Sequence, residues 1–528
     1  MFHSKILIVT IMKRISYILS IFISVLFYTS CDSLDLSPED YYGSSNFWNN
    51  EAQVKGFMTG LHTDLRGDYT LFYLLGEARG GTSRTGTSSL NTSLNYSSPI
   101  KDNQFTKDNV GISSWGGIYS NIMQVNHFIQ KVENECAFLS TESRNTYLGQ
   151  AYGLRALYYF MLYRTWGGVP KITDVKVLDG KVSADKLYTA RSTAEETLAF
   201  IKEDIVKSET FFTNTTAASA SIWSKNATLM LKADIYLWSA KVTTGNHTAA
   251  GRADLEVAKT ALKGISGYSL MNDFSSVFSS KGNNEIIFAI RFMDTEATNW
   301  GSEFLYAQAG FVDAVYGRDG KLLGDVLNLR GNGLLRNEYK ESLWRSYDAT
   351  DSRRDKTFFD FYSKPVNGDF GIVLKKCIGI INSTNDRVYE TDVVLYRYAD
   401  WLLMMAEIEN GLGNSCQAYI NQVRQRAYGD NYNDQVAYKD GSYAENEMAI
   451  LHERDKEFVW EGKRWFDVVR MHDANGKSLV FSASANYPAV YGQSPEALIP
   501  ESQSHKLLWP VDVNTLNNDP LLEQTPGY

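Results

Sequence analysis

The chain contains few of the residues from which metal and catalytic centres are most often built. Its 528 residues include only four cysteines and seven histidines. No two cysteines have CxxC spacing and the histidines are scattered, so the sequence indicates neither a zinc site nor a disulfide framework. The GxSxG, HExxH and glycine-rich phosphate-loop patterns are also missing. These absences predict a protein without a metal or another cofactor, and they leave no motif that marks a catalytic residue.

The sequence also has no basic stripe. Lys and Arg number 52 against 61 Asp and Glu, which gives a formal net charge of −9 at pH 7. Proteins that bind nucleic acid concentrate positive charge on one face, because they neutralise phosphates. Binding to anionic lipid requires a similar basic cluster. We therefore expect no nucleic acid among the partners and no polybasic membrane contact.

Only the N-terminus carries a long hydrophobic run. Lys13 and Arg14 precede the apolar stretch ISYILSIFISVLF, which Tyr-Thr-Ser-Cys follows. The stretch is shorter than the roughly 20 residues that a transmembrane helix needs. A basic start, an apolar run and small residues before a cleavage point are typical of a secretory signal. We expect residues 1–30 to be a signal peptide and residues 31–45 a tether.

Cys31 directly follows Ser30. This arrangement resembles a bacterial lipoprotein site, in which lipid is attached to the cysteine that becomes the new N-terminus. Tyr28 departs from the residue usually found three positions before that cysteine. The alternative is an ordinary signal peptide cut near this point, with Cys31 unmodified.

The strongest helical pattern lies between Leu395 and Arg470. Its first run ends at Gly411 and Gly413, as helices commonly do, and a short turn leads to a second amphipathic run. This is a helical hairpin, the unit of a stacked repeat. A third run interleaves charges with large aromatic residues, so some charges are expected to be buried and paired. The apolar positions of the first two runs are Leu395, Tyr398, Leu402, Met405, Ala406, Leu412, Ala418, Ile420, Val423 and Ala427.

Helical spacing recurs through the first half of the chain. Residues 67–107 have no such spacing and are expected to form a long loop, and residues 285–290 are expected to form a short strand. Residues 265–392 mix glycine, aromatic and polar residues and are expected to be irregular with a few strands. The expected helices cover residues 45–66, 115–132, 141–166, 192–212, 224–242 and 253–264.

Several segments resemble the SusD/RagB family. AEIENGLG, YINQVRQRA and ILHERDKEFVWEGKRWFDVVR occur in the order of that family's C-terminal signature. The ending Gln524–Tyr528 differs at one residue from the family's Gln-Asn-Pro-Gly-Tyr. The resemblance implies a mostly α fold, in which a tetratricopeptide-like scaffold of helical hairpins carries a loop-rich, partly β insert region as a ligand-binding cap. The expected parts are residues 46–264, with a loop insert at about 67–111, then 265–392 and 393–528.

The resemblance also implies a function. Members of this family are surface-exposed glycan-binding lipoproteins of the outer membrane, so the implied anchor is a lipid on Cys31. The implied partners are an oligosaccharide or polysaccharide and a SusC-like TonB-dependent transporter that receives it, without catalysis. The alternatives are a structural adaptor or lid with no strong ligand of its own, a binder of peptide or glycopeptide cargo, and a secreted glycosidase.

Trp300 is the strongest candidate for a ligand-binding residue. It lies between Asn299 and Gly301 in a polar loop, and the C–H groups of a sugar ring pack on an aromatic face while planar polar side chains bind its hydroxyls. A place in the core is the alternative for each aromatic residue. The full set of expected glycan-binding residues is Trp300, Asn299, Tyr306, Tyr316, Tyr73, Arg79 and Tyr96.

Glu453 and Glu457 lie one helical turn apart and have the spacing of a possible glycosidase pair. The neighbouring Arg454, Lys456 and Arg464 favour the other interpretation, in which both carboxylates stay ionised as partners in a structural ion-pair network. We therefore expect no catalytic residue here.

Overall fold

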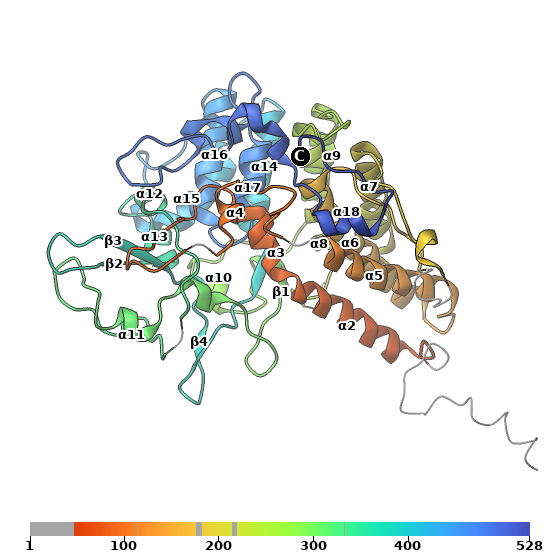
Figure 1. The fold of residues 1–528 in the computed structure, drawn as a ribbon, viewed down its shortest axis with the longest axis horizontal. Helices are drawn as coiled ribbons and strands as arrows, with labels where there is room; N and C mark the ends of the chain where they lie inside the picture. Colours follow the sequence, from red (N-terminus) through yellow and green to blue (C-terminus); the bar gives the residue numbers. More distant parts are fainter. Residues whose placement is uncertain (1–46, 95, 113–114, 176–181, 214–218, 332) are drawn as a thin grey trace, which may run out of the picture.

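The computed structural model describes residues 47–528, except residues 95, 113–114, 176–181, 214–218 and 332. The expected signal peptide, tether and lipidation site at Cys31 lie outside the described residues. The described part is mostly helical, as predicted, and its helices form one body with an irregular region on one side (Figure 1). Within the described part, no helix is both long and apolar enough to cross a membrane.

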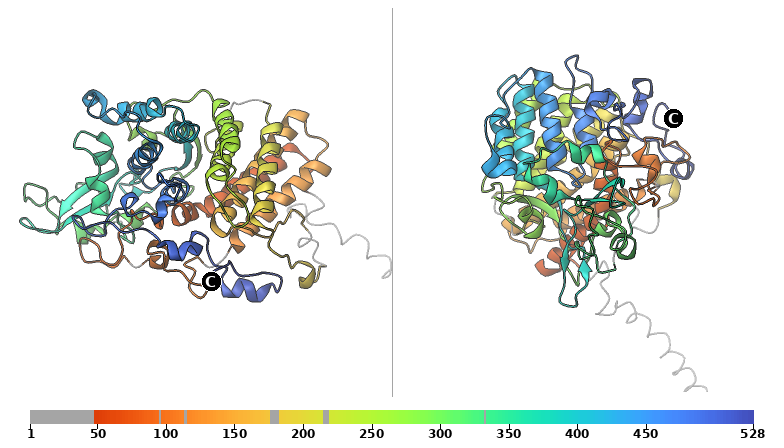
Figure 2. Two further views of the ribbon diagram at one scale, coloured as in Figure 1. Left: turned by 90° about the horizontal axis from the view of Figure 1, so that it is seen from above. Right: turned by 90° about the vertical axis from the view of Figure 1, so that its left-hand side faces the viewer.

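The helices of the N-terminal half pack side by side in chain order. Helix α5 packs on α6, α6 on α7, α7 on α8 and α8 on α9, and Figure 2 shows them as a stack. Helix α6 has the bounds predicted, and α7 begins with a capping box formed by Thr193 and Glu196. The helices are α2 (Glu51–Gly67), α5 (Gly116–Asn134), α6 (Thr141–Trp166), α7 (Ala194–Phe211), α8 (Lys225–Lys241) and α9 (Arg252–Lys263).

The predicted long loop after α2 begins with a helix instead. Helix α3 (Tyr69–Tyr73) continues into a π-helical turn, η1 (Leu74–Ala78), and α4 (Ser98–Lys101) follows later. The buried side of η1 includes a charged residue, Glu77, which accepts hydrogen bonds from the backbone N–H groups of Trp460 (2.7 Å) and Gly462 (2.8 Å). A π-turn with a buried carboxylate lacks the apolar 3.6-residue spacing on which the prediction depended.

The C-terminal half repeats the helical-hairpin arrangement. It contains α14 (Tyr398–Gly411), α15 (Gln417–Tyr428), α16 (Tyr443–Glu457) and α17 (Arg464–Arg470). Helix α14 packs on α9, so the hairpins of both halves form one scaffold. The predicted helix from Leu395 was wrong at its start. Leu395 lies in strand β6 (Val393–Arg397), which pairs antiparallel with β1 (Ile286–Ile290), and both strands are buried throughout.

The region between the two halves is irregular and partly β, as expected. Strand β2 (Phe358–Tyr362) pairs with β3 (Phe370–Leu374), and β4 (Ile380–Ile381) with β5 (Arg387–Val388). A small second core that includes Tyr306, Phe311 and Phe361 fills it. The short helical segments are η3 (Ala184–Lys186), α10 (Ser276–Ser279), η4 (Gly301–Phe304), α11 (Gln308–Phe311), α12 (Glu341–Arg345), α13 (Ser352–Thr357), η5 (Gly429–Asn431), η6 (Leu479–Phe481), η7 (Ala483–Ala485), η8 (Glu501–Leu507) and α18 (Val513–Asn518).

Buried ion pairs join the irregular region to the C-terminal helices. At their centre Arg397 contacts Glu285 (2.7 Å), Glu457 (2.6 Å) and Glu461 (2.8 Å). Burial opposes ionisation of Glu457, but Arg426, Arg397 and Arg353 outweigh it and hold the pKa of this carboxyl well below its usual value. We call this the Arg397 network, and its members are Glu285, Asp351, Arg353, Lys376, Arg397, Arg424, Arg426, Glu453, Glu457 and Glu461.

A second set of buried ion pairs joins the two helical halves. Lys241 of α8 contacts Glu407 of α14 (2.8 Å) and Glu447 of α16 (2.6 Å). In the same set Asp400 is paired with Arg454 (2.8 Å) and Lys463 (2.7 Å). Burial raises the pKa of Asp400, but the two cations outweigh it and lower that pKa to about 2. The packing of the two helical halves against each other therefore depends on charges that are desolvated but paired.

We predict that Arg397→Met lowers the free energy of unfolding by about 3–5 kcal/mol, because it leaves buried carboxylates without their cation. Chemical denaturation monitored by circular dichroism measures this change. Lys321→Met is the control: Lys321 forms an exposed pair with Asp319, and its loss is expected to change stability by less than about 1 kcal/mol. Equal effects of the two substitutions would contradict the prediction.

Candidate functional site

Asn299 fixes the loop that presents Trp300. Its side-chain amide donates to the Thr391 carbonyl (2.6 Å) and its Oδ1 accepts from the backbone N–H of Gly301 (2.8 Å). Gly301 has no room for a side chain, since a Cβ there would lie 2.7 Å from a ring atom of Tyr389. Asn299 is buried. It therefore positions the loop and is not itself available to a ligand.

Trp300 is half-buried and rests on other aromatic rings. Its ring meets those of Tyr73 (5.4 Å), Phe304 (5.8 Å) and Tyr69 (6.3 Å) edge to face. Tyr73 and Phe304 are buried and pack against the inner edge of the tryptophan, whereas Tyr69 is half-buried. These contacts hold one edge of the tryptophan and leave part of the ring accessible.

Tyr96, Arg336 and Glu303 contact one another in series, and Glu303 lies one helical turn after Trp300. Tyr96 is 41% exposed, and the Arg336 guanidinium lies over its ring at 5.0 Å. Arg336 also forms an ion pair with Glu303 (3.1 Å). Burial raises the pKa of Tyr69 to about 12, and the nearby Glu303 and Tyr96 add to the increase. We call Tyr69, Tyr96, Trp300, Glu303 and Arg336 the Trp300 surface.

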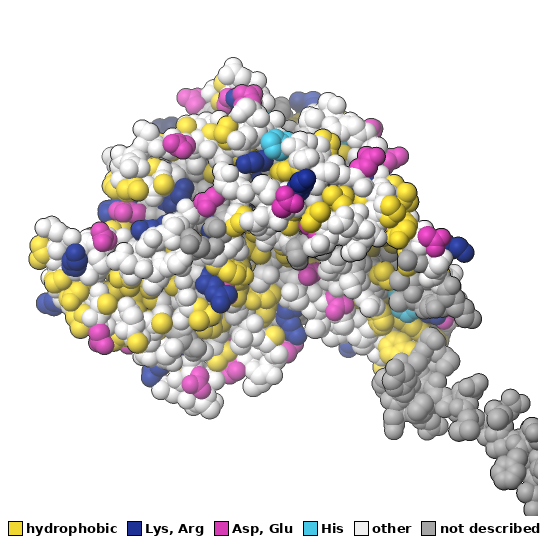
Figure 3. All heavy atoms as spheres, in the orientation of Figure 1, with side chains coloured by type: hydrophobic (Ala, Val, Ile, Leu, Met, Phe, Trp, Pro, Cys, Tyr) yellow, Lys and Arg dark blue, Asp and Glu magenta, His cyan; other side chains and the backbone are white. Residues whose placement is uncertain are grey.

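The Trp300 surface combines apolar ring area with hydrogen-bonding groups. The Oε2 atom of Glu303 is buried and has no hydrogen-bond partner among the described residues. Burial raises the pKa of this carboxyl, while Arg336 and Lys101 lower it. In Figure 3, hydrophobic and basic side chains lie together near the centre of this face, below α3 and α4. Such a surface suits a ligand with both an apolar side and hydroxyl groups.

The other expected binding residues do not join this surface. Tyr306 is 3% exposed in the second core, with its hydroxyl 3.4 Å from Glu338. Arg79 is fully buried, with its guanidinium 3.5 Å from the centre of the Trp465 ring and its Nε donating to Asn103 (2.8 Å). Tyr316 is half-buried and bridges Tyr362 beside the β2–β3 hairpin. Tyr306, Arg79 and Tyr73 are therefore internal packing residues in this structure, because neighbouring rings and hydrogen-bond partners enclose them.

Sequence reasoning missed Tyr69, Glu303 and Arg336. Arg336 is 33 positions after its partner Glu303, and no sequence pattern brings the two together. Tyr69 was assigned to a loop, although it begins α3 and so faces Trp300. Glu303 lies three residues after Trp300, which is the one signal in the sequence that could have identified it.

The two glutamates weighed as a glycosidase pair are structural, as predicted. Glu453 contacts Arg353 (2.7 Å) and Arg424 (2.8 Å), and Glu457 contacts Arg353 and Arg397. Both are buried inside the Arg397 network. Neither carboxylate lies on an accessible surface where a substrate could reach it. Cys136, Cys377 and Cys416 are buried free thiols.

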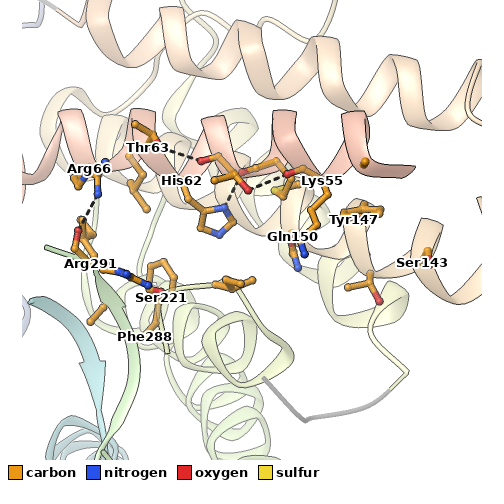
Figure 4. A pocket seen from close by; sticks show the side chains of 18 of the residues that line it. Lys55, His62, Thr63, Arg66, Ser143, Tyr147, Gln150, Ser221, Phe288 and Arg291 are labelled. Atoms are coloured by element: carbon orange, nitrogen blue, oxygen red, sulfur yellow. Dashed lines mark hydrogen bonds between the residues drawn. The ribbon is translucent and has the colours of Figure 1, made fainter. Parts of the chain in front are cut away.

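A groove with a volume of about 750 Å³ runs along α2. Figure 4 shows α2 on one side, with β1 and the start of α6 opposite. Met58, Leu65, Phe288 and Ile290 are buried and form an apolar floor. The exposed or half-buried rim is charged and consists of Glu51, Lys55, Arg66, Glu142, Arg291 and Glu296. We call this the α2–β1 groove.

His62 holds one wall of the α2–β1 groove in place. Its Nε2 accepts a hydrogen bond from the backbone N–H of Trp223 (3.0 Å) and its Nδ1 donates to the Met58 carbonyl (2.9 Å). These bonds require a neutral imidazole. Burial lowers the pKa of His62 from its ordinary 6.5, and the hydrogen bond to Met58 only partly opposes this effect.

The fold and the Trp300 surface define a class: a helical-hairpin scaffold that presents a loop-built aromatic surface. Residues 363–528 match the SusD family model, and residues 32–237 match a SusD-like family described as "Starch-binding associating with outer membrane". A SusD superfamily protein from Bacteroides fragilis is 38% identical, with 91% of this chain and 100% of that chain covered and a TM-score of 0.84. The chain belongs to the SusD family, which confirms the resemblance read from its C-terminal segments.

Two further relatives agree over nearly the whole chain. B. fragilis NanU is 33% identical, with 93% of this chain and 100% of that chain covered and a TM-score of 0.79. The SusD-like protein P38 of Formosa agariphila is 26% identical, with 98% of this chain and 99% of that protein covered. The likeness therefore includes the irregular region that carries the Trp300 surface.

We predict that His62 makes stability fall on acidification. As the pH decreases through 6.5, the unfolded chain takes up a proton that the folded His62 resists, so the folded state loses stability. His62→Gln is expected to reduce the difference in unfolding free energy between pH 7 and pH 5. Denaturant titrations at the two pH values test this, and an unchanged difference would contradict it.

Proposed function

We propose that this protein is a surface glycan-binding lipoprotein. The observation that carries the proposal is the Trp300 surface, where accessible aromatic rings lie beside Arg336 and Glu303. Sugar rings pack their C–H groups on aromatic faces and exchange hydrogen bonds with planar charged groups. The family description that matches residues 32–237, with its starch-binding and outer-membrane terms, supports the same ligand class and location.

We further propose that the protein delivers its ligand to a SusC-like TonB-dependent transporter and takes no catalytic part. Membership of the SusD family supports this partner. The lipid anchor is proposed at Cys31, on the strength of the signal-like segment before it. The absence of an accessible carboxylate pair at Glu453 and Glu457, which the Arg397 network engages, supports a non-catalytic role.

We predict that Tyr96→Ala and Arg336→Ala weaken glycan binding about tenfold or more, since aromatic and arginine anchors dominate binding surfaces. The measurement is affinity electrophoresis of the protein from Asp32 to Tyr528 in gels that contain amylopectin, xylan, galactan, yeast mannan or mucin glycans. Trp300→Ala is added to test the centre of the surface. Because Trp300 also packs on Tyr73 and Phe304, thermal unfolding checks that this variant is folded.

Tyr491→Ala provides a matched control. Tyr491 is 55% exposed and, like Tyr96, has an arginine near its ring, with Arg345 at 5.1 Å. We expect Tyr491→Ala to migrate like the wild type. Retardation that survives Tyr96→Ala, Arg336→Ala and Trp300→Ala would show that the glycan binds elsewhere. No retardation of the wild type on any of these glycans would count against glycan binding and favour the adaptor alternative.

We predict that Cys31→Ala releases the full-length protein from the membrane fraction, because removal of the acylated cysteine removes the anchor. Fractionation of cells, together with labelling by a radioactive fatty acid, measures the change. Wild-type protein is expected to carry the label and to sediment with membranes. Membrane association and labelling that persist in Cys31→Ala would refute the anchor.

A further inference from the structure

We propose that the α2–β1 groove is a second carbohydrate subsite next to the Trp300 surface. The ligand would then be a neutral oligosaccharide chain long enough to occupy both sites. This inference rests on the proposed glycan-binding function. It adds that the ligand is neutral, that it runs from Trp300 into the groove, and that it must be long enough to reach both sites.

The two sites adjoin along two separate segments of the chain. At the end of the groove, Glu296 pairs with Arg66 (2.9 Å) and with Arg291 (3.3 Å). Tyr69 follows Arg66 by three positions, and its ring lies 4.9 Å from that of Phe292, the residue after Arg291. Tyr69 itself belongs to the Trp300 surface. The Arg66–Glu296–Arg291 group is therefore the boundary between the groove and that surface.

The chemistry of the groove favours a ligand that donates hydrogen bonds. Gln150 lines the groove and is 6% exposed, and its Oε1 atom is buried without a hydrogen-bond partner among the described residues. An acyl chain would leave this acceptor unsatisfied at a cost of about 1–3 kcal/mol, and a carboxylate or phosphate oxygen offers no hydrogen to it. A sugar hydroxyl both donates and accepts. Figure 4 shows Gln150 beside Tyr147, a half-buried ring on which a sugar face could pack.

The charge of the rim favours a neutral ligand. Lys55, Arg66 and Arg291 supply three positive charges, and the three glutamates of the rim balance them. Neither an anionic nor a cationic chain gains from such a rim. The floor remains apolar, which suits the C–H side of a sugar ring.

The length of the groove favours a chain over a single sugar. Between Ala52 and Arg66, which both line the groove, α2 rises about 21 Å at 1.5 Å per residue. A ligand along this distance spans several sugar rings before it reaches Tyr69. An oligosaccharide that begins at Trp300 can therefore continue past Glu296 into the groove.

The test is isothermal titration calorimetry with two sizes of one ligand. The polysaccharide that retards the wild type is partially hydrolysed, and its disaccharide and octasaccharide fractions are used as probes. We expect the wild type to bind the octasaccharide about tenfold more tightly than the disaccharide. Gln150→Leu and Tyr147→Ala should bring the ratio of octasaccharide to disaccharide affinity close to one and leave the disaccharide affinity unchanged. Tyr96→Ala should weaken the binding of both oligosaccharides.

Gln150→Leu is the principal variant because leucine has a similar size and removes an unsatisfied acceptor, so the fold is expected to be retained. Gln124→Leu, on the exposed side of α5, is the matched control and should bind as the wild type does. A wild type without length dependence, or an octasaccharide-to-disaccharide ratio unchanged in both groove variants, would overturn the second subsite and leave the Trp300 surface intact. A wild type that no polysaccharide of the panel retards would instead count against the proposed function itself, and no fragments would then be prepared.

Discussion

The structure depends on buried charges that must remain paired. Arg397 is fully buried and contacts three glutamates, one before β1, one at the end of α16 and one in the turn that follows. Burying a charge without a partner is strongly unfavourable, whereas a balanced set is tolerated. Each element that contributes a charge is thereby fixed relative to the others. A substitution at one member destabilises contacts in several elements at once.

The same constraint determines where the Trp300 surface lies. Arg397 ends β6, and β6 pairs with β1, from which the chain continues through Phe292 to Trp300. Glu77 binds η1 to the turn at Trp460 and Gly462. Helix α3, which immediately precedes η1, supplies Tyr69. The Trp300 surface thus forms where the chain leaves β1 and where it enters η1. Buried carboxylates hold both of these elements in place.

Much of the helical scaffold was predictable, because helices such as α6 and α8 carry clear capping residues and apolar spacing. The errors have physical causes. Leu395 lies in an apolar run that is partly a buried strand and partly a helix, and spacing alone does not separate the two. Trp300 was predicted from its polar neighbours, but the pairing of Arg336 with Glu303 depends on the tertiary fold. Arg79 looked like a ligand-binding arginine, yet the rings of Trp465 and Phe105 enclose it.

Hydrogen–deuterium exchange with and without the bound polysaccharide tests the central claim most directly. The account predicts slower exchange at residues 69–73, 96–104, 299–305 and 333–337 when the glycan is bound, because the Trp300 surface lies on these segments. Exchange in α7 and α9 should be unchanged. Protection confined to these two helices, with none around Trp300, would contradict the account and place the ligand on the helical scaffold.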